Sequence, residues 1–176
     1  MTNFRYRAAI SSDFPKVIEL NELSEHFLSP LNLTKLLLLA KEAAVFQVAV
    51  LDDKVAGFLL AFAPAADYQN QNFLFFKARY PDFLYIDRVV IADEFRGKGL
   101  ATQFYSELER EAISRGISRL VCEIHVNPPN AVSLSFHEKL GFIEVAQQII
   151  EEESNQGKVV SLRQKKLLLR RNNMSQ

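Results

Sequence analysis

Arg96-Gly97-Lys98-Gly99-Leu100-Ala101, a glycine-rich stretch between a predicted strand and a predicted helix, decides how this chain folds. Its two glycines let the backbone turn sharply and approach a ligand closely. The following helix presents unpaired amides and the positive end of its dipole, and Arg96 and Lys98 add two charges. This combination predicts a site for a diphosphate group. The spacing matches neither the GxGxxG fingerprint nor the GxxxxGK[ST] loop.

Length and composition fit one globular domain. The chain has 176 residues, 48% of them hydrophobic and 24% charged, and about 150 residues is a usual domain. We predict one domain over residues 4–168 and a polar C-terminal tail over 169–176. Lys plus Arg and Asp plus Glu both number 21, so net charge gives no general attraction to nucleic acid or to an anionic membrane.

Cys122 is the single cysteine, so the sequence predicts neither an internal disulfide nor a thiolate zinc site. The longest apolar run is too short to span a bilayer, and no secretory signal is recognised. A cytoplasmic location is therefore expected.

Hydrophobic periodicity predicts an α/β chain, with a mixed sheet covered by helices on both faces. Gly57, inside one strand, indicates a bulge or a close backbone approach. Residues 65–82 are expected to be irregular. The predicted strands are residues 4–10, 46–51, 55–62, 83–91, 119–126, 142–150 and 158–166. The predicted helices are residues 13–27, 31–44, 98–116 and 130–140.

Three segments together carry a family resemblance. Arg96-x-x-Gly99-x-Ala101 resembles the Q/R-x-x-G-x-G/A signature with which the GNAT superfamily of N-acetyltransferases wraps the pyrophosphate of acetyl-CoA. Residues 130–142, NAVSLSFHEKLGF, resemble the later N-x-x-A-x-x-F-Y-x-x-x-G-F stretch of that family. Val55-Ala56-Gly57-Phe58 is similar to its earlier D-G-x-x-V-G-F element. The strings NPPN and FHEKLGF further resemble a bacterial branch of the superfamily.

The resemblance implies a mostly antiparallel sheet with one splayed parallel strand pair, and an N-acetyltransferase that uses acetyl-CoA and no metal. On this resemblance, a primary amine is expected to attack directly in a ternary complex. In the gap of the splay, backbone groups of Val89 and Ile91 are expected to bind the pantetheine arm, with an amide near Val90 as oxyanion donor. The expected coenzyme-binding residues are Val89, Val90, Ile91, Arg96, Gly97, Lys98, Gly99, Leu100, Ala101, Thr102, Asn127, Asn130, Ser133 and Phe136.

The general base is sought on the strand before the glycine-rich turn. The two-residue period places Tyr85, Asp87, Val89 and Ile91 on one face. Tyr85 stands where the family often has a glutamate, and Asp87 is the nearest carboxylate on that face. A carboxylate inside a central strand is costly unless it is paired or functional. Asp87 is therefore a candidate base or a structural partner of an arginine, either Arg88 or Arg5.

Two further catalytic candidates lie later in the chain. Glu123 and His125 share one face of their strand, so Glu123 is a second candidate base, with a paired structural role as the alternative. His137 follows Phe136 where the family has a tyrosine, and an imidazolium there could protonate the departing thiolate. The missing tyrosine leaves one alternative function, a coenzyme-A-binding regulatory module without transferase activity.

The acceptor is predicted to be a small-molecule amine or a peptide amine, with no nucleic acid and no membrane as partner. The aromatic stretch over residues 68–83 and the acidic residues 151–153 are expected near the acceptor, although either can be plain core or a solvated charge run. A nucleic-acid surface built on Arg96 and Lys98 with the arginines of the next helix is opposed by interleaved glutamates. The sequence is also compatible with a homodimer.

Overall fold

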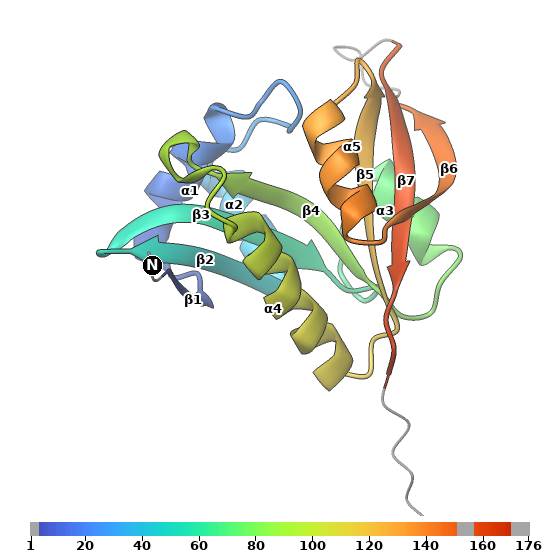
Figure 1. The fold of residues 1–176 in the computed structure, drawn as a ribbon, viewed down its shortest axis with the longest axis horizontal. Helices are drawn as coiled ribbons and strands as arrows, with labels where there is room; N and C mark the ends of the chain where they lie inside the picture. Colours follow the sequence, from blue (N-terminus) through green and yellow to red (C-terminus); the bar gives the residue numbers. More distant parts are fainter. Residues whose placement is uncertain (1–3, 151–156, 170–176) are drawn as a thin grey trace, which may run out of the picture.

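The computed structural model describes residues 4–150 and 157–169, which form one seven-stranded sheet in the order β1-β2-β3-β4-β5-β7-β6 (Figure 1). The strands are β1 (Arg5–Ala8), β2 (Val45–Leu51), β3 (Lys54–Phe62), β4 (Leu84–Ile91), β5 (Arg119–Asn127), β6 (Ile143–Ile149) and β7 (Val159–Lys166). The helices are α1 (Phe14–Glu22), α2 (Leu33–Glu42), α3 (Gln71–Lys77), α4 (Leu100–Ser114) and α5 (Ala131–Lys139). The acidic residues 151–153 and the tail residues 170–176 lie outside the described residues.

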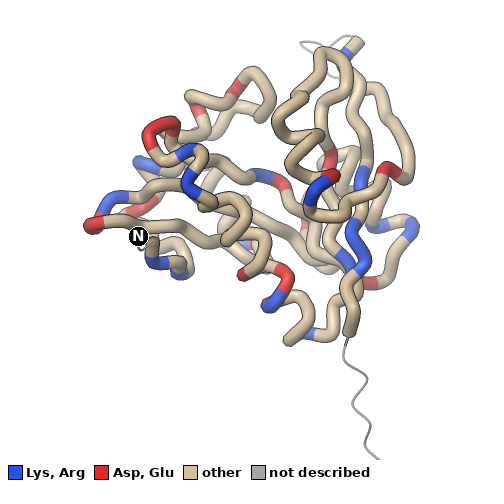
Figure 2. Tube along the Cα trace, viewed as in Figure 1, with Lys and Arg blue, Asp and Glu red and all other residues tan. Residues whose placement is uncertain are grey.

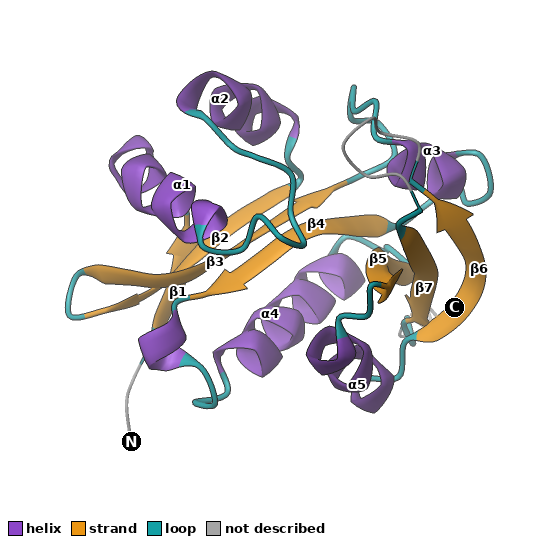
Figure 3. Cartoon of the chain, turned by 90° about the horizontal axis from the view of Figure 1, so that it is seen from above, coloured by secondary structure: helices purple, strands orange, loops and turns teal. Residues whose placement is uncertain are grey.

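Helices cover both faces of the sheet, as the sequence predicts. Figure 3 shows α1 and α2 on one face and α4 and α5 on the other. One buried cluster joins α1, α2 and α3 to the sheet through residues such as Leu20, Leu36 and Phe76. The second cluster packs Phe104 and Leu108 of α4 against the opposite face.

One predicted helix is too long at its C-terminal end, and one helix was not predicted. The predicted helix over residues 13–27 ends at Glu22, because Leu20 is buried but Leu23 is exposed and the apolar stripe stops. Residues 23–32 instead form a loop before α2. The stretch over 65–82, expected to be irregular, contains α3, whose Phe73 and Phe76 are buried in the core.

β4 does not keep the two-residue period that the sequence predicts. Leu60 of β3 pairs with Arg88, whereas Ala61 pairs with Ile86, so Asp87 is an extra residue that forms a bulge. A bulge reverses the side-chain alternation beyond it.

The consequence is that the predicted shared face of β4 is wrong. Tyr85 lies in the cluster beneath α1 to α3, and Asp87 contacts Tyr68 on that same side. Val89 and Ile91 pack instead against the α4 cluster. The bulge therefore reverses the alternation, so that Val89 and Ile91 face the side of the sheet opposite to Tyr85 and Asp87.

β4 and β5 are the parallel pair, and they separate soon after they begin. Their pairing is limited to Leu84 with Leu120 and Tyr85 with Val121, while β5 continues as an antiparallel partner of β7. Figure 1 shows the two halves of the sheet diverging at this point. The predicted splay is confirmed, and it leaves a gap beside the second half of β4.

Gly57 marks a close approach between β3 and β4. A Cβ atom at this position would lie 2.6 Å from the carbonyl oxygen of Val90 and 2.8 Å from the Ile91 side chain. Glycine is therefore required there, as the sequence indicates.

Candidate active site

Two pockets flank the splay. The first, here called the α4 groove, has a volume of about 670 Å³ and is lined by β4, the turn before α4, the start of α4 and α5. The second, here called the polar pocket, has a volume of about 520 Å³ and lies on the opposite face, between β4, β5 and the start of α3. His26 and Phe27, from the loop after α1, line both of them. The pockets therefore meet at this loop.

The α4 groove contains a ready site for an anion. Gly97 and Gly99 have φ angles of 73° and 81°, and nothing lies within 4 Å of where their Cβ atoms would be. The first helical bond of α4 runs from the Gln103 N–H to the Gly99 carbonyl. The amides of the first turn, at Leu100 to Thr102, therefore stay free to meet a ligand in the groove.

The charges of this turn are only partly balanced. Arg96 pairs with Asp93 at 3.0 Å, and both side chains are exposed. The Lys98 ammonium lies 5.2 Å from the centroid of the Phe95 ring. Elsewhere, Figure 2 shows basic and acidic residues interspersed along the chain. The open amides, the glycines and the two cations fit the diphosphate of a coenzyme.

Most of the expected coenzyme-binding residues line this groove. Three do not, namely Val90, Lys98 and Asn127. Asn127 is exposed, and its amide donates to the carbonyl of Gly157 instead. Those that do are Val89, Ile91, Arg96, Gly97, Gly99, Leu100, Ala101, Thr102, Asn130, Ser133 and Phe136.

Val90 has its backbone on the wrong side for the predicted oxyanion donor. The Ala92 N–H donates to a β3 carbonyl at 2.9 Å, and every second residue of an antiparallel strand points its N–H and C=O to the same neighbour. Val90 therefore faces β3, consistent with its carbonyl oxygen lying against Gly57. The backbone groups of Val89 and Ile91 face the gap, where a pantetheine arm could pair with them.

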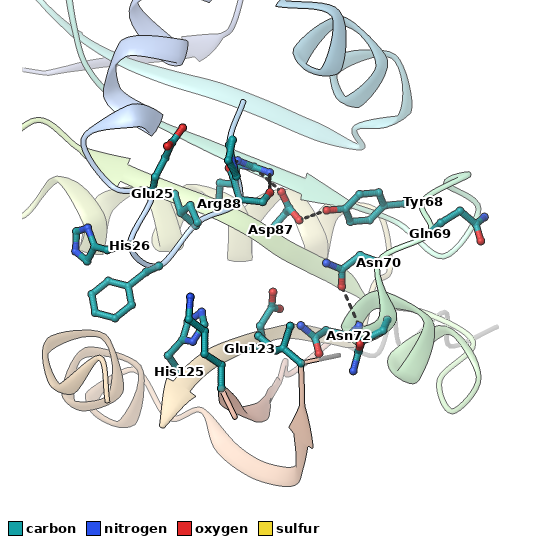
Figure 4. A pocket seen from close by; sticks show the side chains of 17 residues that line it. Glu25, His26, Tyr68, Gln69, Asn70, Asn72, Asp87, Arg88, Glu123 and His125 are labelled. Atoms are coloured by element: carbon teal, nitrogen blue, oxygen red, sulfur yellow. Dashed lines mark hydrogen bonds and ion pairs between the residues drawn. The ribbon is translucent and has the colours of Figure 1, made fainter. Parts of the chain in front are cut away.

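The polar pocket is shaped by a buried ion pair at the bulge of β4 (Figure 4). Arg88 Nε donates to Asp87 Oδ2 at 2.9 Å, and the two side chains are only 2% and 5% exposed. Tyr68 donates its hydroxyl to Asp87 Oδ1 at 2.5 Å. Both oxygens of Asp87 are thus occupied, as in the structural alternative that the sequence left open.

Arg88 also fastens the loop that lines both pockets. Its Nη1 donates to Asn21 Oδ1 at 2.7 Å and to the Ser29 carbonyl at 2.8 Å, and its Nη2 donates to Ser29 Oγ at 2.7 Å. One guanidinium therefore holds the end of α1, the loop and the bulge together.

Glu123 projects from β5 into the polar pocket (Figure 4). Burial raises the pKa of Glu123 to about 7, and the charge of Asp87 adds to this effect. Hydrogen bonds from Tyr85 and Asn72 partly oppose the rise. Oε2 of Glu123 is buried and has no hydrogen-bond partner among the described residues. A carboxylate with these properties can exchange a proton near neutral pH.

Tyr85 lies beneath the pocket instead of lining it. It is fully buried, and its hydroxyl lies 3.3 Å from Asn70 Oδ1 and close to Glu123. Burial raises the pKa of Tyr85 well above its usual value. Its neutral hydroxyl donates to Asn70 Oδ1.

His137 lines the α4 groove, but its surroundings differ from those expected of an imidazolium. Nδ1 lies 2.7 Å from the Ser133 carbonyl, so Nδ1 carries a proton and Nε2 accepts the hydroxyl proton of Tyr105 at 2.6 Å. Burial lowers the pKa of His137. The neutral ring is therefore favoured, and the predicted charged acid is disfavoured at this position.

Sequence reasoning missed several residues of the two pockets. Asn72 and Asn70 belong to the unexpected helix α3, and Asn70 caps it by accepting the Asn72 and Phe73 amides. That capping asparagine, followed by Phe73 and Phe76 three residues apart, was the available signal. Nothing in the local sequence of Tyr105 shows that it reaches His137.

Comparisons with known proteins agree with this geometry. A family model described as "Acetyltransferase (GNAT) family" matches residues 9–142 of this chain. The curated proteins contain no significant match.

Several solved structures share the fold. Ard1 from Thermoplasma volcanium is 14% identical, with a TM-score of 0.75 over 94% of this chain and 98% of its own. The yncA protein from Salmonella typhimurium, solved with its cofactor acetyl-CoA, is 20% identical, with a TM-score of 0.71 over 94% and 95%. Arabidopsis thaliana Naa50, in complex with the bisubstrate analogue CoA-Ac-MVNAL, is 12% identical, with a TM-score of 0.70 over 92% and 97%.

Within residues 4–150 and 157–169, no helix is both long and apolar enough to cross a membrane. The same ranges contain no cluster of three His, Cys, Asp or Glu side chains suited to a metal ion. The splayed strands and the glycine-rich turn at α4 agree with a family match that covers most of the sequence. The chain therefore belongs to the GNAT family, as an N-acetyltransferase that uses acetyl-CoA.

Proposed function

We propose that the polar pocket receives a primary amine and that Glu123 removes its proton for direct attack on the acetyl group. The observation that carries this proposal is the half-buried Glu123, which lines the polar pocket beside the gap between β4 and β5 and whose pKa burial raises to about 7. In a ternary complex the acceptor and the acetyl donor come from opposite faces of the sheet and meet in this gap.

Acetyl-CoA supplies an acetyl group on a thiol leaving group. Glu123 takes one proton from the protonated amine. The free amine nitrogen then forms a bond to the acetyl carbon as the carbon–sulfur bond breaks, and coenzyme A leaves as a thiolate that takes up the second nitrogen proton. The chain holds the donor through the α4 amides and the open backbone of Val89 and Ile91. An amine with a pKa near 10 is mostly protonated at neutral pH, so it needs such a base.

Glu123 suits this task better than Asp87. The carboxylate of Asp87 accepts from Tyr68 and Arg88 and is tied into a buried pair. Glu123 keeps one buried oxygen free and has its pKa near the working pH. We therefore assign Asp87 and Tyr85 positioning roles around Glu123.

The acceptor is a small-molecule amine or a peptide amine. Naa50, which shares the fold, binds a bisubstrate analogue that joins coenzyme A to a peptide, and this supports a peptide amine. The pocket volume of about 520 Å³ suits a small ligand or a chain end. A single domain over residues 4–168, a cytoplasmic location and a homodimer remain predictions of the same proposal.

The test is the pH dependence of thiol release from acetyl-CoA with the best acceptor in an amine panel. Because the base must be ionised, kcat should rise with pH through an apparent pKa of about 7. Glu123→Gln should lower kcat about 100-fold or more and remove this ascending limb.

The matched control is Glu138→Gln, on the exposed surface of α5. It should leave the profile unchanged. An unaltered profile in Glu123→Gln would exclude Glu123 as the base.

A further inference from the structure

Phe27 is an aromatic residue whose place core packing does not explain. Among the residues that the structure describes, it joins neither of the two buried apolar clusters, although its neighbour Leu28 packs against one of them. Phe27 is partly exposed and lines both the α4 groove and the polar pocket. The side chain is therefore open to ligands on both sides.

The ring of Phe27 lies where the two pockets meet. Its centroid is 4.4 Å from that of His26 and 5.7 Å from that of His125 on β5. Val89 and His125 each lie four positions beyond the last residue that pairs β4 with β5, so they flank the gap of the splay. Figure 4 shows His26 and His125 at the end of the polar pocket that lies away from Tyr68. The ring therefore stands beside the gap, between the groove and the pocket.

The loop holds Phe27 in this place from both sides. The N–H groups of Phe27 and Leu28 both donate to the Ser24 carbonyl, at 3.0 and 3.1 Å. Just beyond them, Arg88 donates to the carbonyl and to the hydroxyl of Ser29. Because the backbone is anchored before and after the ring, the fold itself fixes where the ring lies.

The acyl group of the coenzyme has to reach this junction. With the diphosphate at the turn before α4 and the amine in the polar pocket, the acyl carbon lies between the two. A chain longer than acetyl would either displace the Phe27 ring or pass it into the polar pocket. There it would occupy the place of the amine and meet charged side chains such as Glu25 and Lys158.

We propose that the Phe27 ring sets the length of the acyl group that the chain transfers, and that it excludes chains longer than acetyl. A fixed wall discriminates against added methylene groups, because each of them needs space that the ring fills. Phe27 is thus a specificity-determining residue for the acyl donor. The inference rests on the proposed function only for the side from which the amine enters, and it holds whichever residue is the base.

The test measures binding without an amine and without turnover. S-ethyl-, S-butyl- and S-hexyl-coenzyme A are thioethers that do not transfer their alkyl groups, and calorimetric titration gives their affinities for the full chain. The parent should bind S-hexyl-coenzyme A at least about tenfold more weakly than the S-ethyl compound. Phe27→Ala should reverse this order, with a gain of about fourfold for each methylene group that enters the vacated space.

Two further variants separate a wall from a general effect on the groove. Phe27→Leu fills part of the space and should give an intermediate preference. Phe95→Ala is the matched control, because Phe95 lines the α4 groove at the turn, beside Lys98, and does not line the polar pocket. It should change all three affinities by the same factor and keep the order of the parent.

Three outcomes would overturn the proposal. They are equal or tighter binding of the S-hexyl compound by the parent, the order of the parent kept in Phe27→Ala, and the same reversal in Phe95→Ala, which would mean a general loosening of the groove. An unaltered pH profile in Glu123→Gln, together with a reversed order in Phe27→Ala, would instead reject the base and keep the acyl limit.

Discussion

His137 stands where the family resemblance predicts a proton donor. Its hydrogen bonds are instead those of a residue that holds the hydroxyl of Tyr105. Tyr105 is fully buried, and burial raises its pKa well above the usual value. A neutral hydroxyl in such a place needs an acceptor, and His137 Nε2 provides it. The Ser133 carbonyl fixes the ring for this purpose.

His137→Phe should therefore act on stability more than on chemistry. Loss of the acceptor leaves the Tyr105 hydroxyl unpaired and should lower the free energy of unfolding by about 1–3 kcal/mol. The double variant with Tyr105→Phe should recover part of this loss, because both polar partners are then gone. Urea unfolding of the four proteins measures the coupling.

Kinetics on the same variants test the opposite case, in which His137 is catalytic. If His137 were the acid, the single variant would lose about 100-fold or more in kcat and would lose the descending limb of the pH profile. Unchanged stability with such a loss would restore the catalytic role.

At the scale of elements, β4 shows what the sequence could and could not predict. The strand, the turn after it and the following helix can be predicted from the apolar spacing and the glycines. The bulge at Asp87 is not, because it arises from the pairing with β3 and leaves no local signal. Tyr85 and Val89 therefore lie on opposite faces, and the site is divided between two pockets.

The coenzyme side was predictable for a related reason. Gly97 and Gly99 act through their own backbone, so the neighbouring residues in the sequence are enough to find the turn. The acceptor side depends on α3, on the loop over residues 23–32 and on β5, which meet only in the folded chain. Of these, Glu123 was a catalytic candidate, and residues 68–83, which contain α3, were expected near the acceptor.

The turn before α4 gives the prediction that belongs to this scale. Gly99→Glu puts bulk and a negative charge at the N-terminus of α4, where the diphosphate is expected. Coenzyme A binding should therefore be abolished. Gly99→Asn tolerates the left-handed φ of 81° without added charge and should retain much of the affinity. Calorimetric titration with coenzyme A compares the two variants. Parent-like affinity in Gly99→Glu would remove the α4 groove as the coenzyme site.

On the scale of the whole molecule, the loop over residues 23–32 connects the two pockets. It contributes His26 and Phe27 to both pockets, and Arg88 fastens it to the bulge beside the acceptor. His125 contacts the same loop through its ring, whose centroid lies 5.7 Å from that of Phe27. Any loosening of this loop should therefore change the shape of both pockets, which lie on opposite faces of the sheet.

Ser29→Ala tests this connection without breaking the buried ion pair. It removes the 2.7 Å hydrogen bond from Arg88 to Ser29 Oγ and keeps the bond to the Ser29 carbonyl. We expect a stability loss of about 1 kcal/mol, together with a severalfold rise in KM for both acetyl-CoA and the amine at nearly unchanged kcat. Ser135→Ala, on the exposed side of α5, is the control and should change neither KM. A rise confined to one substrate would show that the loop serves that pocket alone, because a shared wall must move for both.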